Sequence, residues 1–379
     1  MKKVDLQKLK VAIVHDFFME YGGAERVVEV IHDTFPNSDV YTALVNRKAM
    51  KIHWYRLKNW RFHLSWFGKT PILRHYPSAL RFLTPLVWES FDFSQYDLVI
   101  SSSGWFMCKG VITRPETLHL SYIHHQNKFL TYYETPDNWK TNWLKRVYGY
   151  IIGTPLRMWD YVSSSRPDVM VANSKETAKR INKYYRRQAL VLYPPVKDPL
   201  IKLTQKQKAT KDYYLTVNRL TKPKHIEVLI EAANILGVTL YVVGTGREMG
   251  PLKALAKKNV IFTGEVSETQ LSELYFGAKA FLFASVDEEF GIAPVEAMMR
   301  GLPVIAYKSG GLKETIKHGV NGFLVNELTG EAFVKMIKKL EKENYQFLST
   351  NSYHQAKKYS VAVFQKKLLD LVEHHLESR

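Results

Sequence analysis

Residues 280–306, AFLFASVDEEFGIAPVEAMMRGLPVIA, constrain the fold of this chain more than any other stretch. Two short apolar runs, residues 280–284 and 304–306, predict buried strands. Between them lie an acidic loop and a helix that begins near Pro294 and ends at Gly301, because proline is favoured in the first turn of a helix and glycine just past its end. Strand, loop, helix and strand form one repeat of a parallel α/β sheet.

Two carboxylates flank this turn of the predicted sheet. Glu288 lies in the loop after the first strand, and Glu296 lies in the first turn of the helix. Parallel α/β sheets bind ligands outside the carboxyl ends of their strands, so we expect both carboxylates to face one pocket. Taken alone, the same residues would also suit a capped helix that follows an acidic loop.

Length and charge narrow the possible classes of protein. A chain of 379 residues predicts two domains that each bury a core, and no run of about 18 apolar residues suggests a membrane-spanning helix. The first residues lack the apolar core of a signal peptide, and the single cysteine, Cys108, fits a reducing cytoplasm. The net charge of +18 predicts a phosphate-bearing partner. Charge alone does not distinguish nucleotides, nucleic acid and anionic lipid as that partner.

Further strand–loop–helix units occur along the chain. A strand ending at His15 leads through the glycine turn Gly22-Gly23 into a helix, an arrangement that lets backbone N–H groups approach a phosphate. Another predicted strand ends at His124. In the second half, a strand over residues 213–217 precedes a loop with several cations, ahead of a further helix.

The Glu-x7-Glu pattern, with Phe-Gly inside it and the strand GLPVIA after it, resembles the signature of the retaining GT-B glycosyltransferases of family 4, also called group 1. The resemblance extends over nearly the whole chain. It implies an α/β fold of two Rossmann-like domains facing each other across a cleft, with a C-terminal helix that crosses back to the first domain. The implied boundaries are an acceptor-binding domain at 1–197 joined by the helix 359–379, a linker at 198–211, and a nucleotide-sugar-binding domain at 212–358.

The same resemblance implies the residues of the site. The implied catalytic residues are His124, Glu288, Arg219 and Lys224. The implied donor-binding residues are Gly22, Gly23, Arg219, Lys224, Val266, Glu288, Phe290, Gly291, Ile292 and Glu296.

Each implied residue has a physical role in such a reaction. Glu296 holds the ribose and Glu288 the donor sugar, whereas Val266 reaches the base through its main chain. Arg219 and Lys224 neutralise the charge that develops on the leaving diphosphate, although Lys222 competes with Lys224 for that role. Gly22-Gly23 lies against the diphosphate, and His124 faces the reacting sugar. The sequence departs from the family pattern directly after His124, which leaves the role of His125 open.

The first domain looks most like bacterial mannosyltransferases of surface-polysaccharide assembly. We therefore expect a hexosyltransferase that uses GDP-mannose as donor and a lipid-diphosphate-linked oligosaccharide or polysaccharide as acceptor. A UDP-sugar donor is the alternative. No cofactor and no metal are expected, because no His/Asp cluster has ligand spacing. Retention of configuration by front-face attack or by double displacement is left open.

Residues 51–88 contain no acidic residue and alternate cations with aromatic side chains. This composition suits either a packed core with a solvated basic face or docking on an anionic membrane. Binding of single-stranded nucleic acid is a distant third interpretation, and no nucleic acid is expected as a partner. The expected location is the cytoplasm, with peripheral attachment to the inner face of the cell membrane as a possibility that this segment raises.

Gly244-Thr245-Gly246 suggest a second class of enzyme. These glycines faintly resemble the dinucleotide fingerprint of an NAD-dependent oxidoreductase. That fingerprint requires the helix to open inside the glycine loop, whereas Pro251 marks the helix start here. The oxidoreductase interpretation is therefore disfavoured.

Overall fold

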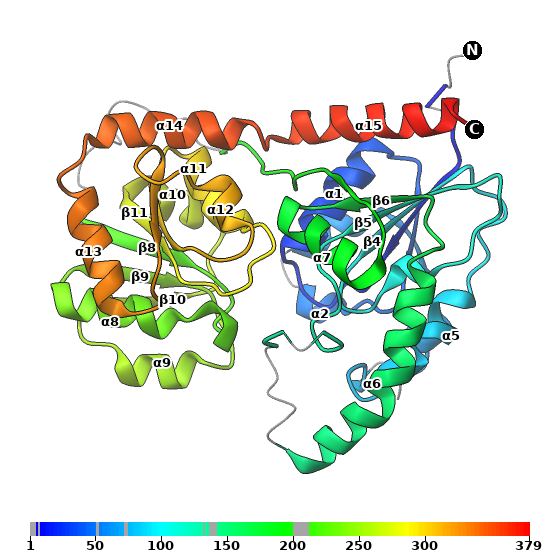
Figure 1. The fold of residues 1–379 in the computed structure, drawn as a ribbon, viewed down its shortest axis with the longest axis horizontal. Coiled ribbons are helices and arrows are strands. Elements are labelled where there is room, and N and C mark those ends of the chain that lie inside the picture. The colour runs from blue at the N-terminus through cyan, green and yellow to red at the C-terminus, as the bar shows by residue number, and fades with distance from the viewer. Residues whose placement is uncertain are drawn as a thin grey trace. The chain divides into compact units, whose positions relative to one another are not determined.

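The computed structural model describes residues 5–6, 8–50, 53–71, 75–131, 133–135, 142–199 and 212–379. The chain divides into two compact units, each built on a parallel sheet (Figure 1). Unit 1 consists of Met1–Pro195 and Ala362–Arg379, and unit 2 consists of Val196–Val361. All but two residues of the linker predicted at 198–211 lie outside the described residues.

Unit 1 contains, among its described residues, a seven-stranded sheet in the order β3-β2-β1-β4-β5-β6-β7, with every pairing parallel. The central strands β1, β4 and β5 are buried along their whole length, because helices and loops cover both faces of a parallel sheet. The strands are β1 Val11–His15, β2 Asp39–Thr42, β3 Arg61–Leu64, β4 Leu98–Ser103, β5 Leu118–Ile123, β6 Val169–Ala172 and β7 Leu190–Val191.

The C-terminal helix α15 (Val361–Glu377) packs on unit 1. Its buried side chains Phe364, Leu368 and Val372 recur every four residues, and the Phe364 ring meets Tyr122 of β5 with the ring centroids 6.0 Å apart. The other helices of unit 1 are α1 Gly23–Thr34, α2 Arg47–Met50, α3 Trp54–Leu57, α4 Trp66–Lys69, α5 Thr84–Glu89, α6 Trp143–Ser163 and α7 Lys175–Tyr185. None of the described helices is both long and apolar enough to cross a membrane.

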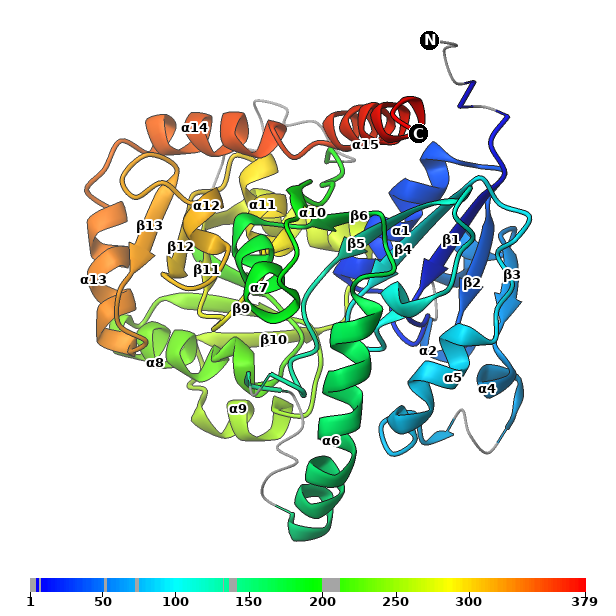
Figure 2. The same ribbon diagram turned by 45° about the vertical axis from the view of Figure 1, so that its right-hand side comes forward.

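Unit 2 contains, in its described part, a six-stranded parallel sheet in the order β10-β9-β8-β11-β12-β13. The strands are β8 Tyr213–Val217, β9 Thr239–Val243, β10 Val260–Gly264, β11 Ala278–Phe283, β12 Val304–Tyr307 and β13 Gly322–Val325. The helices are α8 Ile226–Leu236, α9 Met249–Leu255, α10 Glu268–Gly277, α11 Ile292–Met299, α12 Leu312–Thr315, α13 Gly330–Leu340 and α14 Tyr345–Lys357 (Figure 2). The predicted fold class of two Rossmann-like α/β domains is thereby confirmed.

Both sheets reverse their direction of growth at one point. After β1 the chain adds β2 and β3 on one side, and it then returns to add β4 on the other. The same reversal occurs between β8 and β11 in unit 2. At such a switch point the loops of two neighbouring strands diverge, which leaves room for a ligand at their carboxyl ends.

Five of the nine aromatic residues of the segment 51–88 are buried or partly buried. Phe67 and Trp88 are fully buried, and the Trp88 indole N–H donates to the carbonyl of Phe106. Two of its cations are ion-paired, Arg56 with Glu29 and Arg61 with Asp39. The partly buried aromatics are Trp54, Trp60 and Phe62, whereas Tyr55, Trp66, Tyr76 and Phe82 are exposed. Residues 51–52 and 72–74 lie outside the described residues, and docking of this segment on a membrane stays a prediction.

Two histidines in unit 1 have lowered pKa values, and we therefore expect the protein to lose stability in acid. Burial lowers the pKa of His119 to about 3 and that of His32 to about 4. Below pH 6.5 the unfolded chain binds protons at these positions and the folded chain does not. The free energy of unfolding should therefore fall by at most about 1.4 kcal/mol per pH unit for each histidine between pH 6.5 and 5.

Urea midpoints of the wild type and of His119→Gln at pH 7, 6 and 5 check this expectation. The variant should show a smaller change with pH, whereas the matched variant His354→Gln, on the exposed side of α14, should keep the wild-type change. Equal pH dependence in all three proteins would contradict the account.

Candidate functional site

At the switch point of unit 2, an ion pair joins the two strand-end loops. Lys224 Nζ lies 2.5 Å from Glu288 Oε2 and donates to Ser285 Oγ at 3.2 Å. The Ser285 hydroxyl donates to the same Glu288 oxygen at 2.7 Å. Lys224 follows β8, whereas Ser285 and Glu288 follow β11. The side chains of the ion pair are 23% and 19% exposed, so both remain accessible from solvent.

The main chain around Glu288 is held by Ser309-Gly310-Gly311, which follow β12. The N–H of Gly311 donates to the Glu288 carbonyl at 2.8 Å, and the Ser309 hydroxyl accepts the N–H of Asp287 at 2.9 Å. A Cβ on Gly310 would lie 1.9 Å from the Glu288 carbonyl oxygen, and φ of Gly310 is +52°. Only glycine tolerates both conditions, so Gly310 fixes the position of the acidic loop.

Helix α11 carries Glu296 away from this loop. The helix starts after Gly291, whose φ of +84° lets the chain turn, and Phe290 before it packs edge-on against Tyr359 at 5.2 Å between ring centroids. The Tyr275 hydroxyl lies 3.4 Å from Glu296 Oε2. Ile292 and Glu296 are partly buried.

Arg219 and Val266 lie on loops at the same edge of the sheet, after β8 and β10, with β9 between these two strands. Arg219 is exposed, two residues beyond β8, and Val266 is partly buried, two residues beyond β10. Gly244 and Gly246 support the Arg219 loop, because Cβ atoms there would lie 2.0 Å from the Asn218 carbonyl and 2.2 Å from the Leu220 carbonyl. The glycines that faintly resemble a dinucleotide fingerprint therefore have a packing role.

In unit 1, a chain of polar contacts joins the glycine turn to His124. The Gly22 N–H donates to Glu25 Oε2 at 2.8 Å, and Glu25 Oε1 lies 3.5 Å from His15 Nε2. His15 Nδ1 lies 3.1 Å from the Ser102 hydroxyl, which is 2.7 Å from His124 Nε2. Gly23 is the first residue of α1. Gly22 and His124, which the sequence connects only through resemblance, are thus connected here through intervening side chains.

Burial, followed by the nearby His15 and His125, lowers the pKa of His124 well below its usual value. The imidazole of His124 is therefore neutral at physiological pH. Its carbonyl accepts a hydrogen bond from the Asn173 amide at 2.8 Å, which holds the strand end in place. A neutral imidazole at this position can accept or donate a hydrogen bond but adds no positive charge.

Sequence reasoning missed the buried carboxylate of Asp16. It is 4% exposed and accepts the backbone N–H groups of Gly104, Phe106 and Cys108 at 2.8–2.9 Å. These bonds tie the loop after β1 to the loop after β4 at the switch point of unit 1. The dipeptide His15-Asp16 at the end of the first strand was a visible signal, but nothing in the sequence shows which main-chain groups it would bind.

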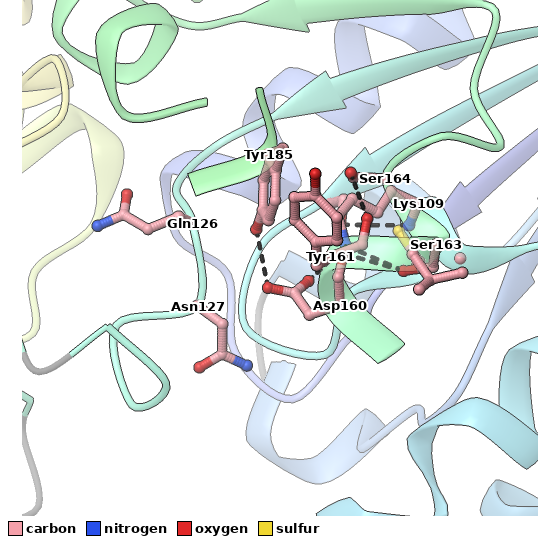
Figure 3. A network of polar contacts seen from close by, with 12 residues as sticks. Lys109, Gln126, Asn127, Asp160, Tyr161, Ser163, Ser164 and Tyr185 are labelled. Carbon is pink, nitrogen blue, oxygen red and sulfur yellow. Dashed lines mark hydrogen bonds and ion pairs between the residues drawn. The ribbon is translucent and has the colours of Figure 1, made fainter. Parts of the chain in front are cut away.

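Gln126 was also missed, although it lies two residues beyond His124. Its side chain is fully buried, and neither amide atom has a hydrogen-bond partner among the described residues. Figure 3 shows the amide directed away from Asp160 and Tyr185. A buried amide without a partner costs stability, about 1–3 kcal/mol. A polar group retained at such a cost is a candidate for contact with a ligand.

Among the described residues, no three or more His, Cys, Asp or Glu side chains gather as a group that could hold a metal ion. The charged side chains of the site in unit 2 include Lys224 and Glu288, which are in contact, and Arg219 on the same edge of the sheet.

The support of the acidic loop by Gly310 can be tested with a matched pair of substitutions. Gly319 has a φ of +76° and no atom within 4 Å of an added Cβ, so Gly319→Ala should cost about 1 kcal/mol of unfolding free energy from the backbone alone. Gly310→Ala adds a steric conflict with Glu288 and should cost about 3 kcal/mol. Chemical unfolding measures both, and equal costs would contradict the assigned support.

Part of the chain is similar to known glycosyltransferases. Residues 201–361 match the family model of the glycosyl transferases group 1. An uncharacterised glycosyltransferase of Methanocaldococcus jannaschii is 41% identical over 120 residues, which cover 29% of this chain and 31% of that protein. The alpha-1,3/1,6-mannosyltransferase ALG2 of Dictyostelium discoideum is 25% identical over 273 residues, 58% of this chain and 61% of that protein. The chain thus spans less than two thirds of the length of these relatives.

Among solved structures, Anabaena HepE in complex with UDP-glucose matches with a TM-score of 0.72 and 18% identity, covering 96% of this chain and 99% of that one. At this identity the match establishes the fold and nothing beyond it. The ion pair at the switch point, its supporting glycines and α11 all lie inside the matched region 201–361. The chain therefore has the GT-B fold, and its residues 201–361 carry the sequence pattern of the glycosyl transferases group 1.

Proposed function

We propose that this protein is a retaining, family-4 hexosyltransferase that transfers a sugar from a nucleotide-diphospho-sugar to a glycan acceptor. The observation that carries the proposal is the Lys224–Ser285–Glu288 cluster at the switch point of unit 2, inside the region that matches the group 1 model. Unit 2 is the proposed donor-binding domain and unit 1 the proposed acceptor-binding domain. Neither a metal ion nor a cofactor is required in this proposal.

The cluster suits a leaving diphosphate because an ammonium group has three N–H donors. Ser285 and Glu288 take two of them, and we assign the third to a diphosphate oxygen. Arg219 adds a second positive charge from the same sheet edge. Charge that develops as the sugar bond breaks is thereby stabilised by fixed cations, which is a large catalytic effect in a partly desolvated site.

Glu288 and Glu296 bind the neutral parts of the donor in this proposal. Glu288 accepts hydrogen bonds from sugar hydroxyls, together with the main chain at Phe290, Gly291 and Ile292. Glu296 holds the ribose, and the main chain of Val266 meets the base. The Lys224 ammonium stabilises the Glu288 carboxylate and makes it a weaker nucleophile, which supports front-face attack over a double displacement through this residue.

In unit 1, His124 is proposed to hydrogen-bond the reacting sugar as a neutral imidazole. Ser102 occupies Nε2, so the other ring nitrogen, Nδ1, is the one assigned to the substrate. Gly22 and Gly23 are proposed to lie against the diphosphate. Glu25 accepts the Gly22 N–H and contacts His15. A donor bound at the glycine turn would therefore also affect the position of His15.

GDP-mannose is the favoured donor, and a lipid-diphosphate-linked oligosaccharide or polysaccharide of the cell surface is the favoured acceptor. The similarity to the mannosyltransferase ALG2 supports mannose. The alternative, a UDP-sugar, is supported by the fold shared with HepE, whose structure holds UDP-glucose. An NAD-dependent oxidoreductase is disfavoured, since Gly244 and Gly246 pack directly on the loop before α8.

Nucleotide binding tests the donor site. Thermal unfolding is followed with GDP, UDP, ADP, GDP-mannose and NAD for the wild type, Arg219→Ala, Lys224→Ala and the control Lys222→Ala, an exposed lysine in the same turn. One nucleotide diphosphate at a hundred times its dissociation constant should stabilise the wild type and the control by about 2.7 kcal/mol. The stabilisation should be lost in Arg219→Ala and Lys224→Ala. Stabilisation by NAD alone, or by no nucleotide, would overturn the proposal.

We further propose that the Gln126 amide in unit 1 forms a hydrogen bond with the substrate, and a substitution tests this role. Gln126→Leu removes a buried amide that has no partner, so the unfolding free energy should stay equal or rise by about 1 kcal/mol. Sugar transfer, measured with the donor that the binding experiment identifies, should fall at least about tenfold, since one lost substrate hydrogen bond costs that much or more.

The neighbouring Asn127→Leu is the matched control. Its amide donates to the Trp105 carbonyl at 2.9 Å, so this variant should lose stability where Gln126→Leu does not. Unchanged transfer by Gln126→Leu would remove Gln126 from the site.

A further inference from the structure

Helix α6 is apolar on two opposite faces. One face packs on unit 1, where Ile152 and Leu156 meet a cluster that includes Met107, Phe129 and Leu130. A helix needs only one apolar face to pack against its own protein. The second face of α6 therefore calls for an explanation.

The C-terminal half of α6 is anchored by a buried ion pair (Figure 3). Lys109 pairs with Asp160 and also lies 3.2 Å from the Ser163 hydroxyl, whereas the Tyr185 hydroxyl donates to the second oxygen of Asp160 at 3.0 Å. Lys109 and Asp160 are 1% and 4% exposed. This anchor sets which face of α6 points outward. The N-terminal half of the helix projects beyond the sheet of unit 1 (Figures 1 and 2).

The outward face is a stripe of large apolar side chains. Exposed fractions reach 65% at Trp143, 68% at Ile151 and 66% at Met158. Successive members lie one, three or four residues apart or two turns apart, so they share one side of the helix. The stripe is defined here by Trp143, Leu144, Val147, Ile151, Met158 and Val162.

The charges of α6 have one sign wherever they reach solvent. Lys145 and Arg146 are exposed and Arg157 is partly so, whereas the single acid of the helix, Asp160, is neutralised in its buried ion pair. The whole chain carries a net charge of +18. A second copy of this chain would bring cations against cations, and an acidic surface would attract them. A helix with an exposed apolar stripe and exposed cations on its other sides is complementary to anionic lipid head groups above acyl chains.

We propose that α6 lies in the interface of an anionic membrane, with its stripe at the level of the acyl chains and Lys145 and Arg146 among the head groups. The purpose of this docking, delivery of a lipid-linked acceptor to unit 1, rests on the proposed function. The docking surface itself is argued independently of that function. The proposal moves the predicted membrane contact away from most of the segment 51–88, in which five of the nine aromatic side chains are buried or partly buried.

One part of that segment adjoins α6 and extends the surface. The Tyr148 hydroxyl of α6 donates to the Ala79 carbonyl, and the Trp159 indole N–H donates to Glu89 at 2.9 Å. Between these two contacts, Phe82 and Leu86 are 46% and 58% exposed. The docking surface therefore consists of the α6 stripe with Phe82 and Leu86 beside it.

Co-sedimentation with vesicles tests the proposal. Vesicles of phosphatidylcholine alone are compared with vesicles of equal parts phosphatidylcholine and phosphatidylglycerol. The wild type should bind the anionic vesicles and lose binding as salt rises. Ile151→Asp with Met158→Asp, and separately Lys145→Glu with Arg146→Glu, should each weaken binding at least about tenfold. The control Ile235→Asp with Leu255→Asp changes apolar residues of unit 2 that are 53% and 55% exposed, and it should bind like the wild type.

Three results would overturn the proposal. The wild type does not bind anionic vesicles, or the α6 variants bind as well as the wild type. Alternatively, light scattering shows a dimer that Ile151→Asp dissociates, which would make a second copy the occupant of the stripe. The urea midpoints of the α6 variants should stay close to that of the wild type, which shows that they fold. Stabilisation by the donor nucleotide should also be unchanged in these variants. It also separates failure of this inference from failure of the proposed function.

Discussion

The contact between Lys224 and Glu288 depends on a constraint of topology. These residues are 64 positions apart in the sequence, and they meet because the sheet of unit 2 reverses its growth between the adjacent strands β8 and β11. Parallel pairing then places both strand-end loops at one edge. The approach is closed by backbone contacts that exclude side chains, at Gly310 against Glu288 and at Gly244 against Asn218. The charged groups of the site are thus positioned by residues that carry no charge.

In unit 1 the two strand-end loops at the switch point are held together by a side chain, in contrast to the close backbone contacts at glycines in unit 2. Its switch point lies between β1 and β4, and the two loops there are tied by the Asp16 carboxylate through three backbone N–H groups. A carboxylate with three such bonds is well compensated for its burial. Asp16 is consequently a structural acid, whereas Glu288, which remains accessible and paired with an ammonium, is suited to ligand binding.

Much of this arrangement could be predicted from the sequence, because strand and helix signals in residues 280–306 are local and strong. The family resemblance also implied Glu288 and, with Lys222 as a competing candidate, Lys224, and the structure shows Lys224 and Glu288 in contact. Gln126 could not be distinguished from Asn127 in this way. Only in the folded chain does the Asn127 amide have a hydrogen-bond partner while the Gln126 amide has none among the described residues. Aromatic residues show the same limit: Trp88 and the exposed Trp143 are the same residue type, and only tertiary packing separates their environments.

The buried pair of Lys109 and Asp160 has a consequence for the history of this chain. Removing one partner of a buried ion pair leaves an uncompensated charge and costs about 3–5 kcal/mol, whereas replacing both by apolar residues is often neutral. Single steps away from the pair are therefore strongly disfavoured, although the double replacement is not. In descendants of this sequence, positions 109 and 160 should be kept together or exchanged together, with Tyr185 free to lose its hydroxyl only after the pair has gone.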